Sequence, residues 1–197
     1  GTVNSGNVAA FAPIMQQARV PLMAGPAIAT NITAKFIDQD PSYIFRCSMV
    51  EKYQVDAILD WGVKTFDKIG MLHGTTGYGM FAAGEIQKGM EERGVKLVAV
   101  ESGSPQANDV TPQALQLKNA GAELVLLFHD SFELLYRALP KADYRPVIAG
   151  NWGMSSQMIL NILGKEALEG SVMGQALDMN DPKAQEFDAK MKAEYGD

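Results

Sequence analysis

The chain has 197 residues, of which 47% are hydrophobic and 20% are charged, with a formal net charge of -6 and a single cysteine. A chain of this size and composition buries one or two hydrophobic cores and is not disordered. The negative charge and the scattered Lys and Arg residues argue against a nucleic-acid partner, which would require clustered positive charge. The lone Cys47 excludes an internal disulfide.

The start of the chain carries no targeting signal. No run of eighteen apolar residues predicts a membrane span, and no signal peptide opens the sequence. Residues 1–6 have the composition of a loop, and the sequence does not begin with an initiator methionine. We therefore expect the chain to begin inside a longer protein.

Helices and short strands are predicted over the first 66 residues. Ser5 is a suitable N-cap for a helix over residues 8–19, whose apolar side chains recur at helical spacing. The pattern then predicts a strand over 20–23, a loop over 24–31, a helical turn over 32–36, a strand over 43–46 and a helix over 50–66.

From residue 68 onward the sequence alternates regularly between apolar runs and amphipathic segments. The predicted strands cover residues 69–72, 96–100, 124–128, 147–149 and 172–176, and the helices between them cover 81–93, 112–120, 132–139 and 155–163. This alternation predicts an α/β fold, a doubly wound parallel sheet with helices on both faces. A last helix is predicted over residues 181–195.

Two aromatic residues are placed where such a sheet binds ligands, at the carboxyl ends of its strands. Tyr78 follows the strand 69–72 and its polar loop, although a tyrosine that only packs on its own helix is an open alternative. Trp152 lies just after the strand 147–149 and is suited to form a flat apolar wall of a cleft.

The sequence lacks the usual signatures of catalysis, phosphate binding and dinucleotide binding. His129 and Asp130, at the end of an apolar strand, are the best acid–base pair, and they also suit a cleft wall or a helix start. Cys47 has no recognisable base near it in sequence, and no further ligand near His129 indicates a metal. We therefore predict no metal and no cofactor.

Several stretches, taken together and in order, resemble a known family: the periplasmic substrate-binding proteins of branched-chain amino acid ABC transporters, also called type I extracellular ligand-binding receptors. The similar stretches are residues 3–6 with 12–13 and 20–22, then 74–79, 108–110 with 115–123, 146–153 and 167–170. No single stretch is specific, and the resemblance covers nearly the whole chain.

The resemblance implies two α/β lobes that close on a ligand. Residues 1–48 would form a partial first lobe, 49–178 the second lobe, and 179–197 a helix that returns toward the first. Complete members of the family are longer, so the resemblance implies an internal fragment with an incomplete first lobe. It also implies a monomeric, non-enzymatic receptor, periplasmic or extracellular and membrane-anchored, that delivers a small carboxylate to a membrane permease.

The resemblance implies that residues of the first lobe bind the ligand carboxylate, and we call this set of residues the carboxylate grip. Ser5 matches the serine that holds the ligand carboxylate, and Pro26, Ala27 and Ile28 match a loop whose backbone N–H groups complete the grip. The family's threonine position is Ile28 here, and Thr30 is close enough in sequence to substitute for it.

The second lobe supplies the remaining contacts implied by the resemblance. Tyr78 matches a tyrosine that closes over the ligand, and Phe128, beside His129, matches another aromatic position. Trp152 stands where amino-acid binders carry the acidic partner of the ligand ammonium. We therefore expect an aromatic or branched carboxylate without an α-amino group, unless Asp130 replaces the missing carboxylate.

Two alternatives stay open at this point. A ligand-sensing regulatory domain of the same fold would show the same residues. An enzyme on a flavodoxin-like sheet would use His129 and Asp130.

Overall fold

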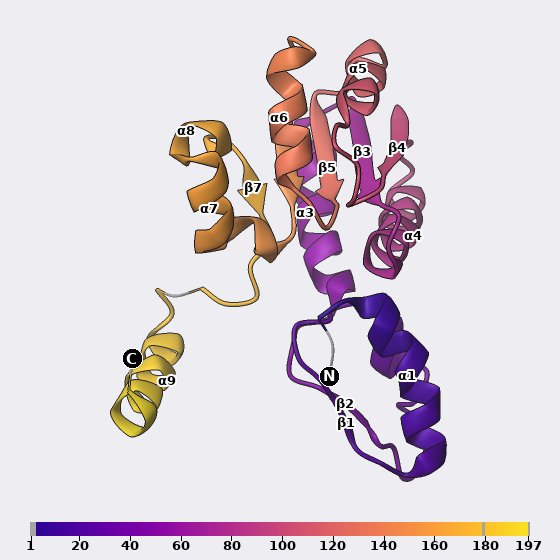
Figure 1. Cartoon of the computed structure of the whole chain (residues 1–197), viewed down its shortest axis with the longest axis vertical. Coiled ribbons are helices and arrows are strands. Elements are labelled where there is room, and N and C mark those ends of the chain that lie inside the picture. The colour runs from indigo at the N-terminus through magenta and orange to yellow at the C-terminus, as the bar shows by residue number, and fades with distance from the viewer. Residues whose placement is uncertain (1–2, 179, 197) are drawn as a thin grey trace.

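The structure is a computed structural model that describes residues 3–178 and 180–196. The loop expected at residues 1 and 2 therefore lies outside the described residues. The described chain forms a two-stranded and a five-stranded sheet, both parallel, one at each end of the molecule (Figure 1).

The two-stranded part is built from residues 3–47. It contains α1 (Ser5–Ala18), β1 (Leu22–Ala24), α2 (Asn31–Ala34) and β2 (Ile44–Arg46). The two strands pair in parallel, and Val8, Ile32 and Ile44 are among the side chains of its small core.

The first helix begins earlier than the sequence predicted, which corrects the role of one residue. Asn4, not Ser5, is the N-cap, because its side chain accepts a hydrogen bond from the Gly6 N–H at 2.9 Å. Ser5 therefore lies inside the first turn and is buried.

The five-stranded part follows α3 (Glu51–Thr65) and has the strand order β4-β3-β5-β6-β7. Its strands are β3 (Ile69–Gly74), β4 (Ala99–Gly103), β5 (Leu124–Phe128), β6 (Val147–Gly150) and β7 (Val172–Met173). Its helices are α4 (Gly77–Glu92), α5 (Thr111–Asn119), α6 (Glu133–Lys141), η1 (Trp152–Ser155), α7 (Gln157–Leu163) and α8 (Lys165–Leu168). The predicted α/β class with a parallel sheet is confirmed.

The central strand β5 shows why this sheet is buried on both faces. All five of its residues are buried, as expected for a parallel sheet covered by helices on each side. Val125 and Leu127 belong to the core beside α5 and α6, whereas Leu126 and Phe128 belong to the core beside α3 and α4. From β3 the chain goes to its neighbour β4 on one side and then crosses to β5 on the other, so the strand order reverses between β3 and β5. In parallel sheets, ligands bind beside such a reversal.

Several element boundaries differ from the prediction: β7 ends at Met173 rather than residue 176, for example, and the physical reason is clear for two others. The edge strand β4 begins at Ala99 rather than residue 96, because pairing with Gly70 of β3 sets its register. Helix α4 begins at Gly77, four residues early, so Tyr78 lies in its first turn rather than in a loop. An added Cβ at Gly79 would overlap the backbone of Gly74, so glycine permits this close start.

The last helix, α9 (Pro182–Tyr195), stands apart from the five-stranded sheet, at the end of the molecule where β1 and β2 lie (Figure 1). Phe187 and Tyr195 on this helix are exposed. The division of the chain into lobes at residues 48 and 178 stays a prediction. Within residues 3–178 and 180–196, no helix combines the length and apolar character that a membrane crossing requires.

Candidate functional site

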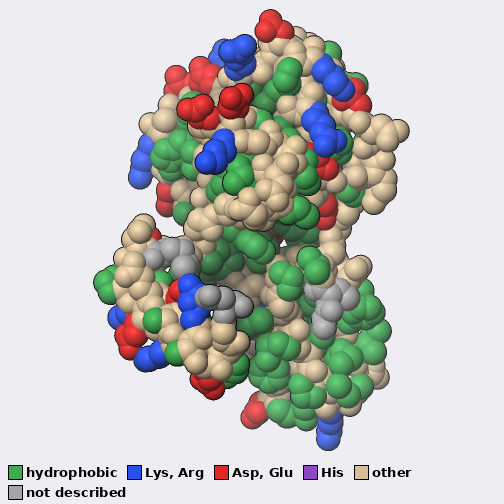
Figure 2. Space-filling model, turned by 60° about the vertical axis from the view of Figure 1, so that its left-hand side comes forward, with side chains coloured by type: hydrophobic (Ala, Val, Ile, Leu, Met, Phe, Trp, Pro, Cys, Tyr) green, Lys and Arg blue, Asp and Glu red, His purple; other side chains and the backbone are tan. Residues whose placement is uncertain are grey.

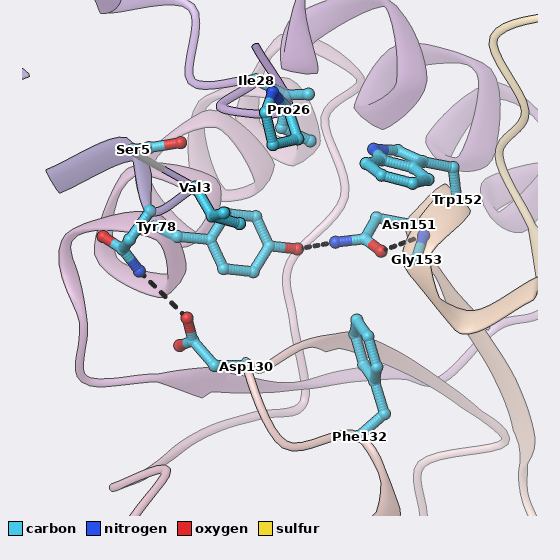
Figure 3. Close-up of a pocket in the computed structure, with 11 residues that line it drawn as sticks. Val3, Ser5, Pro26, Ile28, Tyr78, Asp130, Phe132, Asn151, Trp152 and Gly153 are labelled. Atoms are coloured by element: carbon cyan, nitrogen blue, oxygen red, sulfur yellow. Dashed lines mark hydrogen bonds between the residues drawn. The ribbon is translucent and has the colours of Figure 1, made fainter. Parts of the chain in front are cut away.

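A cavity of about 210 Å³ lies where the two-stranded part meets the carboxyl ends of β3, β5 and β6. Figure 2 shows the narrow waist between the two ends of the molecule, with apolar side chains gathered beside it. The cavity is lined by Val3, Asn4, Ser5, Pro26, Ile28, Tyr78, Asp130, Phe132, Asn151, Trp152 and Gly153 (Figure 3). Small-molecule sites are commonly somewhat larger, about 300–1,000 Å³, so the cavity suits a small ligand.

Tyr78 and Asn151 form the floor of the cavity. The Asn151 side-chain amide donates a hydrogen bond to the Tyr78 hydroxyl, and its carbonyl oxygen accepts one from the Gly153 N–H at 2.8 Å (Figure 3). Burial, together with the negative charge of Glu51, raises the pKa of Tyr78 well above its ordinary value. The Tyr78 hydroxyl therefore stays neutral and serves as a fixed hydrogen-bonding group.

The two-stranded part supplies the opposite wall through Ser5, Pro26 and Ile28. The Ser5 hydroxyl accepts a hydrogen bond from the Ala29 N–H at 3.2 Å, which holds the loop 26–29 against the start of α1. The Ser5 O–H itself is still able to donate to a ligand oxygen.

Two residues assigned to the carboxylate grip lie outside the lining of this cavity. Ala27 is 1% exposed and belongs to the small core. The Thr30 hydroxyl accepts a hydrogen bond from the Lys52 N–H at 3.2 Å, near the start of α3. The structure thus keeps Ser5, Pro26 and Ile28 in the lining and removes Ala27 and Thr30 from it.

The aromatic wall of the second part consists of Trp152 and Phe132, not Phe128. Trp152 is 37% exposed and turns its indole toward the cavity (Figure 3). Phe128 is fully buried in the core beside α3 and α4 and lies outside the lining of this cavity, so its contact with a ligand stays a prediction. Phe132, four residues on and just before α6, lines the cavity instead.

His129 is held by backbone groups on both sides of its ring. Its Nε2 lies 2.9 Å from the Gly103 carbonyl oxygen and its Nδ1 accepts from the Ser131 N–H at 2.9 Å. Burial lowers the pKa of His129, so the ring is neutral. Because both nitrogens are occupied and the side chain is 1% exposed, His129 fixes the loop and lies outside the cavity lining.

A hydrogen-bond network joins the two parts of the molecule beside the cavity. The Asn4 side-chain amide donates to Asp130 Oδ1 at 3.1 Å, and the Thr76 hydroxyl donates to Asp130 Oδ2 at 2.6 Å. The starts of α1 and α4 also touch, since a Cβ added at Gly6 would lie 2.9 Å from Gly77 Cα. The two parts are therefore in close contact in this conformation.

The charges around the cavity are few. Asp130 is the one charged side chain among the described lining residues. A ligand carboxylate would thus rely on neutral donors rather than on Lys or Arg. Among residues 3–178 and 180–196, no group of three His, Cys, Asp or Glu side chains gathers as a metal site requires.

The whole chain matches the model of one protein family. Residues 1–197 match the family described as periplasmic binding protein. The chain is also 24% identical to the Leu/Ile/Val-binding protein homolog 3 of Brucella melitensis, over 98% of this chain and 52% of that protein. The chain thus spans about half the length of the curated relatives it matches.

Solved structures show the same fold. A type 1 periplasmic binding protein from Bordetella pertussis superposes with a TM-score of 0.85 and 20% identity, over 98% of this chain and 54% of that chain. An ABC transporter solute-binding protein from Rhodopseudomonas palustris, solved in complex with 3,4-dihydroxybenzoic acid, superposes with a TM-score of 0.73 and 23% identity, over 98% of this chain and 54% of that one.

Proposed function

The chain belongs to the periplasmic binding protein family, and from this premise we propose that it is part of a solute-binding receptor of an ABC transporter. The receptor binds a small carboxylate between two lobes and does no chemistry on it. The observation that carries the proposal is the cavity between the two-stranded part and the carboxyl ends of β3, β5 and β6.

The lining of the cavity supports a ligand with one polar and one apolar end. The Ser5 hydroxyl offers a neutral hydrogen-bonding group at one side. Trp152 and Phe132 offer flat apolar surface at the other, which suits a ring or a branched chain. We therefore propose an aromatic or branched carboxylate as the ligand.

The absence of an α-amino group is the finer part of this proposal. An ammonium placed against Trp152 would lose its water without gaining a counter-charge. Asp130, the charged residue of the lining, already accepts hydrogen bonds from Asn4 and Thr76. A ligand without an ammonium leaves that network undisturbed.

One observation favours a second candidate, an α-amino acid. Asp130 lines the cavity, and each carboxylate oxygen has capacity for a further hydrogen bond. In this case the ligand ammonium would bind Asp130 beside Asn4. Two curated relatives are named Leu/Ile/Val-binding protein homologs, and those names agree with this candidate.

The proposed receptor acts outside the cytoplasm as a monomer and passes its ligand to a membrane permease. A ligand-sensing domain of the same fold would bind ligand in the same way and would have a signalling partner in place of the permease. The buried, backbone-bound His129 does not favour the enzymatic alternative.

The test is a screen of small carboxylates that follows both melting temperature and ligand turnover. A ligand that binds only the folded state raises the melting temperature. We expect stabilisation by aromatic or branched carboxylates that are recovered intact. Chemical conversion of a stabilising compound would contradict a receptor, and stabilisation by no carboxylate would contradict the proposed ligand class.

A substitution in the cavity tests the ligand class separately. Trp152→Glu places a carboxylate where the indole now stands, so it should reduce or reverse the preference for 3-phenylpropionate over phenylalanine. Exposed Met158, six residues on in α7, provides Met158→Glu as a control that adds the same charge outside the lining. An unchanged preference in Trp152→Glu would show that the indole does not select the ligand.

A further inference from the structure

A second cavity adjoins the candidate site and shares the Trp152 side chain with it. Its volume is about 300 Å³, and Pro26, Ile28 and Trp152 line both cavities. Its remaining walls come from Gly25, residues 47–49 and Ala176. The two cavities therefore share walls, and Trp152 is the largest of the side chains that line both.

The polar side chains of the second cavity already have partners. The Ser48 hydroxyl donates to the Ala27 carbonyl oxygen at 2.8 Å, and the Cys47 thiol donates to the Ala24 carbonyl oxygen at 3.5 Å. No charged residue is among its described lining residues. The cavity thus offers apolar surface, and its polar groups need no hydrogen bond from an occupant.

The two cavities differ in chemistry in a way that orients a ligand. The first cavity has four polar lining residues, Asn4, Ser5, Asp130 and Asn151, whereas the polar groups of the second, Ser48 and Cys47, are bonded to backbone carbonyl oxygens. An extended ligand would keep its carboxylate in the first cavity and direct its apolar end the other way. The second cavity also contains Met49, whose flexible side chain adapts to different apolar shapes.

We propose that the second cavity is a subsite for an apolar tail, so that the ligand is a carboxylate whose ring or chain extends past Trp152 toward Cys47, Met49 and Ala176. The inference rests on the proposed function and deepens it. The tail contributes affinity through apolar burial, and its length sets which carboxylates bind best.

The single cysteine gives a direct readout of occupancy. Cys47 is exposed and lines the second cavity, so iodoacetamide should modify it in the protein without ligand. The probes are benzoate, which reaches only the first cavity, and 4-hexylbenzoate, whose tail reaches the second. At saturation, 4-hexylbenzoate should slow the modification of Cys47 by about tenfold or more, and should bind about tenfold or more tightly than benzoate. Benzoate should leave the modification rate within about twofold of the unliganded protein.

Each other result is decisive. Equal protection by both probes would mean that closure alone shields Cys47, and would overturn the subsite. Binding of both probes by calorimetry without protection by either would also overturn it. If calorimetry shows that neither carboxylate binds, the proposed aromatic ligand class is overturned and the subsite with it.

A variant that fills the second cavity provides an independent check. Ala176→Phe should lower the ratio of the 4-hexylbenzoate affinity to the benzoate affinity from about tenfold toward one. The ratio is taken within one variant, so a general loss of folding does not affect it. Ala167→Phe makes the same change at an exposed position of α8 outside both cavities and should keep the ratio of the parent protein. An unchanged ratio in Ala176→Phe would overturn the subsite.

Discussion

Glu51 is a buried carboxyl group at the start of α3, and replacing it by glutamine should change how stability depends on pH. Its side chain is 0% exposed, and neither carboxylate oxygen has a hydrogen-bond partner within the described residues. Burial and the negative charge of Glu85, opposed by Arg46, raise the pKa of Glu51 to about 8. The Arg46 guanidinium instead donates to carbonyl oxygens of the loop, including Ile28 at 3.0 Å and Ala29 at 2.8 Å.

The sign and size of the effect follow from this pKa. The folded protein keeps the Glu51 proton up to about pH 8, whereas the unfolded chain releases it near its ordinary value of 4.5. Between these values the folded state binds more protons, so the contribution of Glu51 is fully present below about pH 4.5 and is lost as pH rises through about 8. At about 1.4 kcal/mol per pKa unit, the full shift corresponds to about 5 kcal/mol in the free energy of unfolding.

Urea unfolding at pH 5, 7 and 9 measures this dependence. Because glutamine does not ionise, Glu51→Gln should become more stable relative to the parent protein as pH rises, by several kcal/mol between pH 5 and 9 (about 5 at most). Glu91→Gln, at an exposed position of α4, is the matched control and should follow the parent profile. Parallel profiles for Glu51→Gln and the parent protein would refute a protonated, buried Glu51.

Two further substitutions test the contact between the two parts of the molecule and the floor of the cavity. Gly77→Ala should place a methyl group against Gly6 and weaken ligand binding by about tenfold or more in calorimetry. Gly84→Ala in the same helix is the control and should bind ligand normally, because an added Cβ there meets nothing within 4 Å. Tyr78→Phe should remove the hydroxyl that accepts from Asn151 and lower the free energy of unfolding by about 1–3 kcal/mol in urea titrations; an unchanged stability would show that the buried amide finds another partner.

Local sequence patterns predicted the sheet well, because a buried parallel strand appears in the sequence as a continuous run of apolar residues. The run 124–128 was predicted as a strand and β5 has the same bounds, since all of its side chains are buried. The edge strand β4 alternates between more and less buried residues and was misplaced, because its pairing with β3 rather than its own pattern sets its bounds.

The site could be predicted only in part. Tyr78 and Trp152 follow strands at the ligand edge of the sheet, and both line the cavity. The choice between Phe128 and Phe132 depends on which face of the sheet each side chain meets, and the strand position favoured Phe128, which lies outside the lining.

Contacts between distant residues left no local signal. Asn4 and Asp130, which join the two parts of the molecule, are 126 residues apart in sequence. Glu51 lies at the start of the helix predicted over residues 50–66, and its position in the sequence carries no signal of burial. The start of α3 packs against the loop at Ile28, where the Glu51 N–H donates to the Ile28 carbonyl oxygen at 2.8 Å. Only this packing reveals that the Glu51 side chain is buried.

The ligand class is the central claim, and calorimetry with phenylalanine and 3-phenylpropionate tests it most directly. The two compounds share a ring and a carboxylate and differ in the α-amino group. With Trp152 in the lining and Asp130 engaged by Asn4 and Thr76, 3-phenylpropionate should bind more tightly by about 1–3 kcal/mol, the penalty for an unpaired buried polar group. Tighter binding of phenylalanine would contradict the account and assign the ammonium to Asp130.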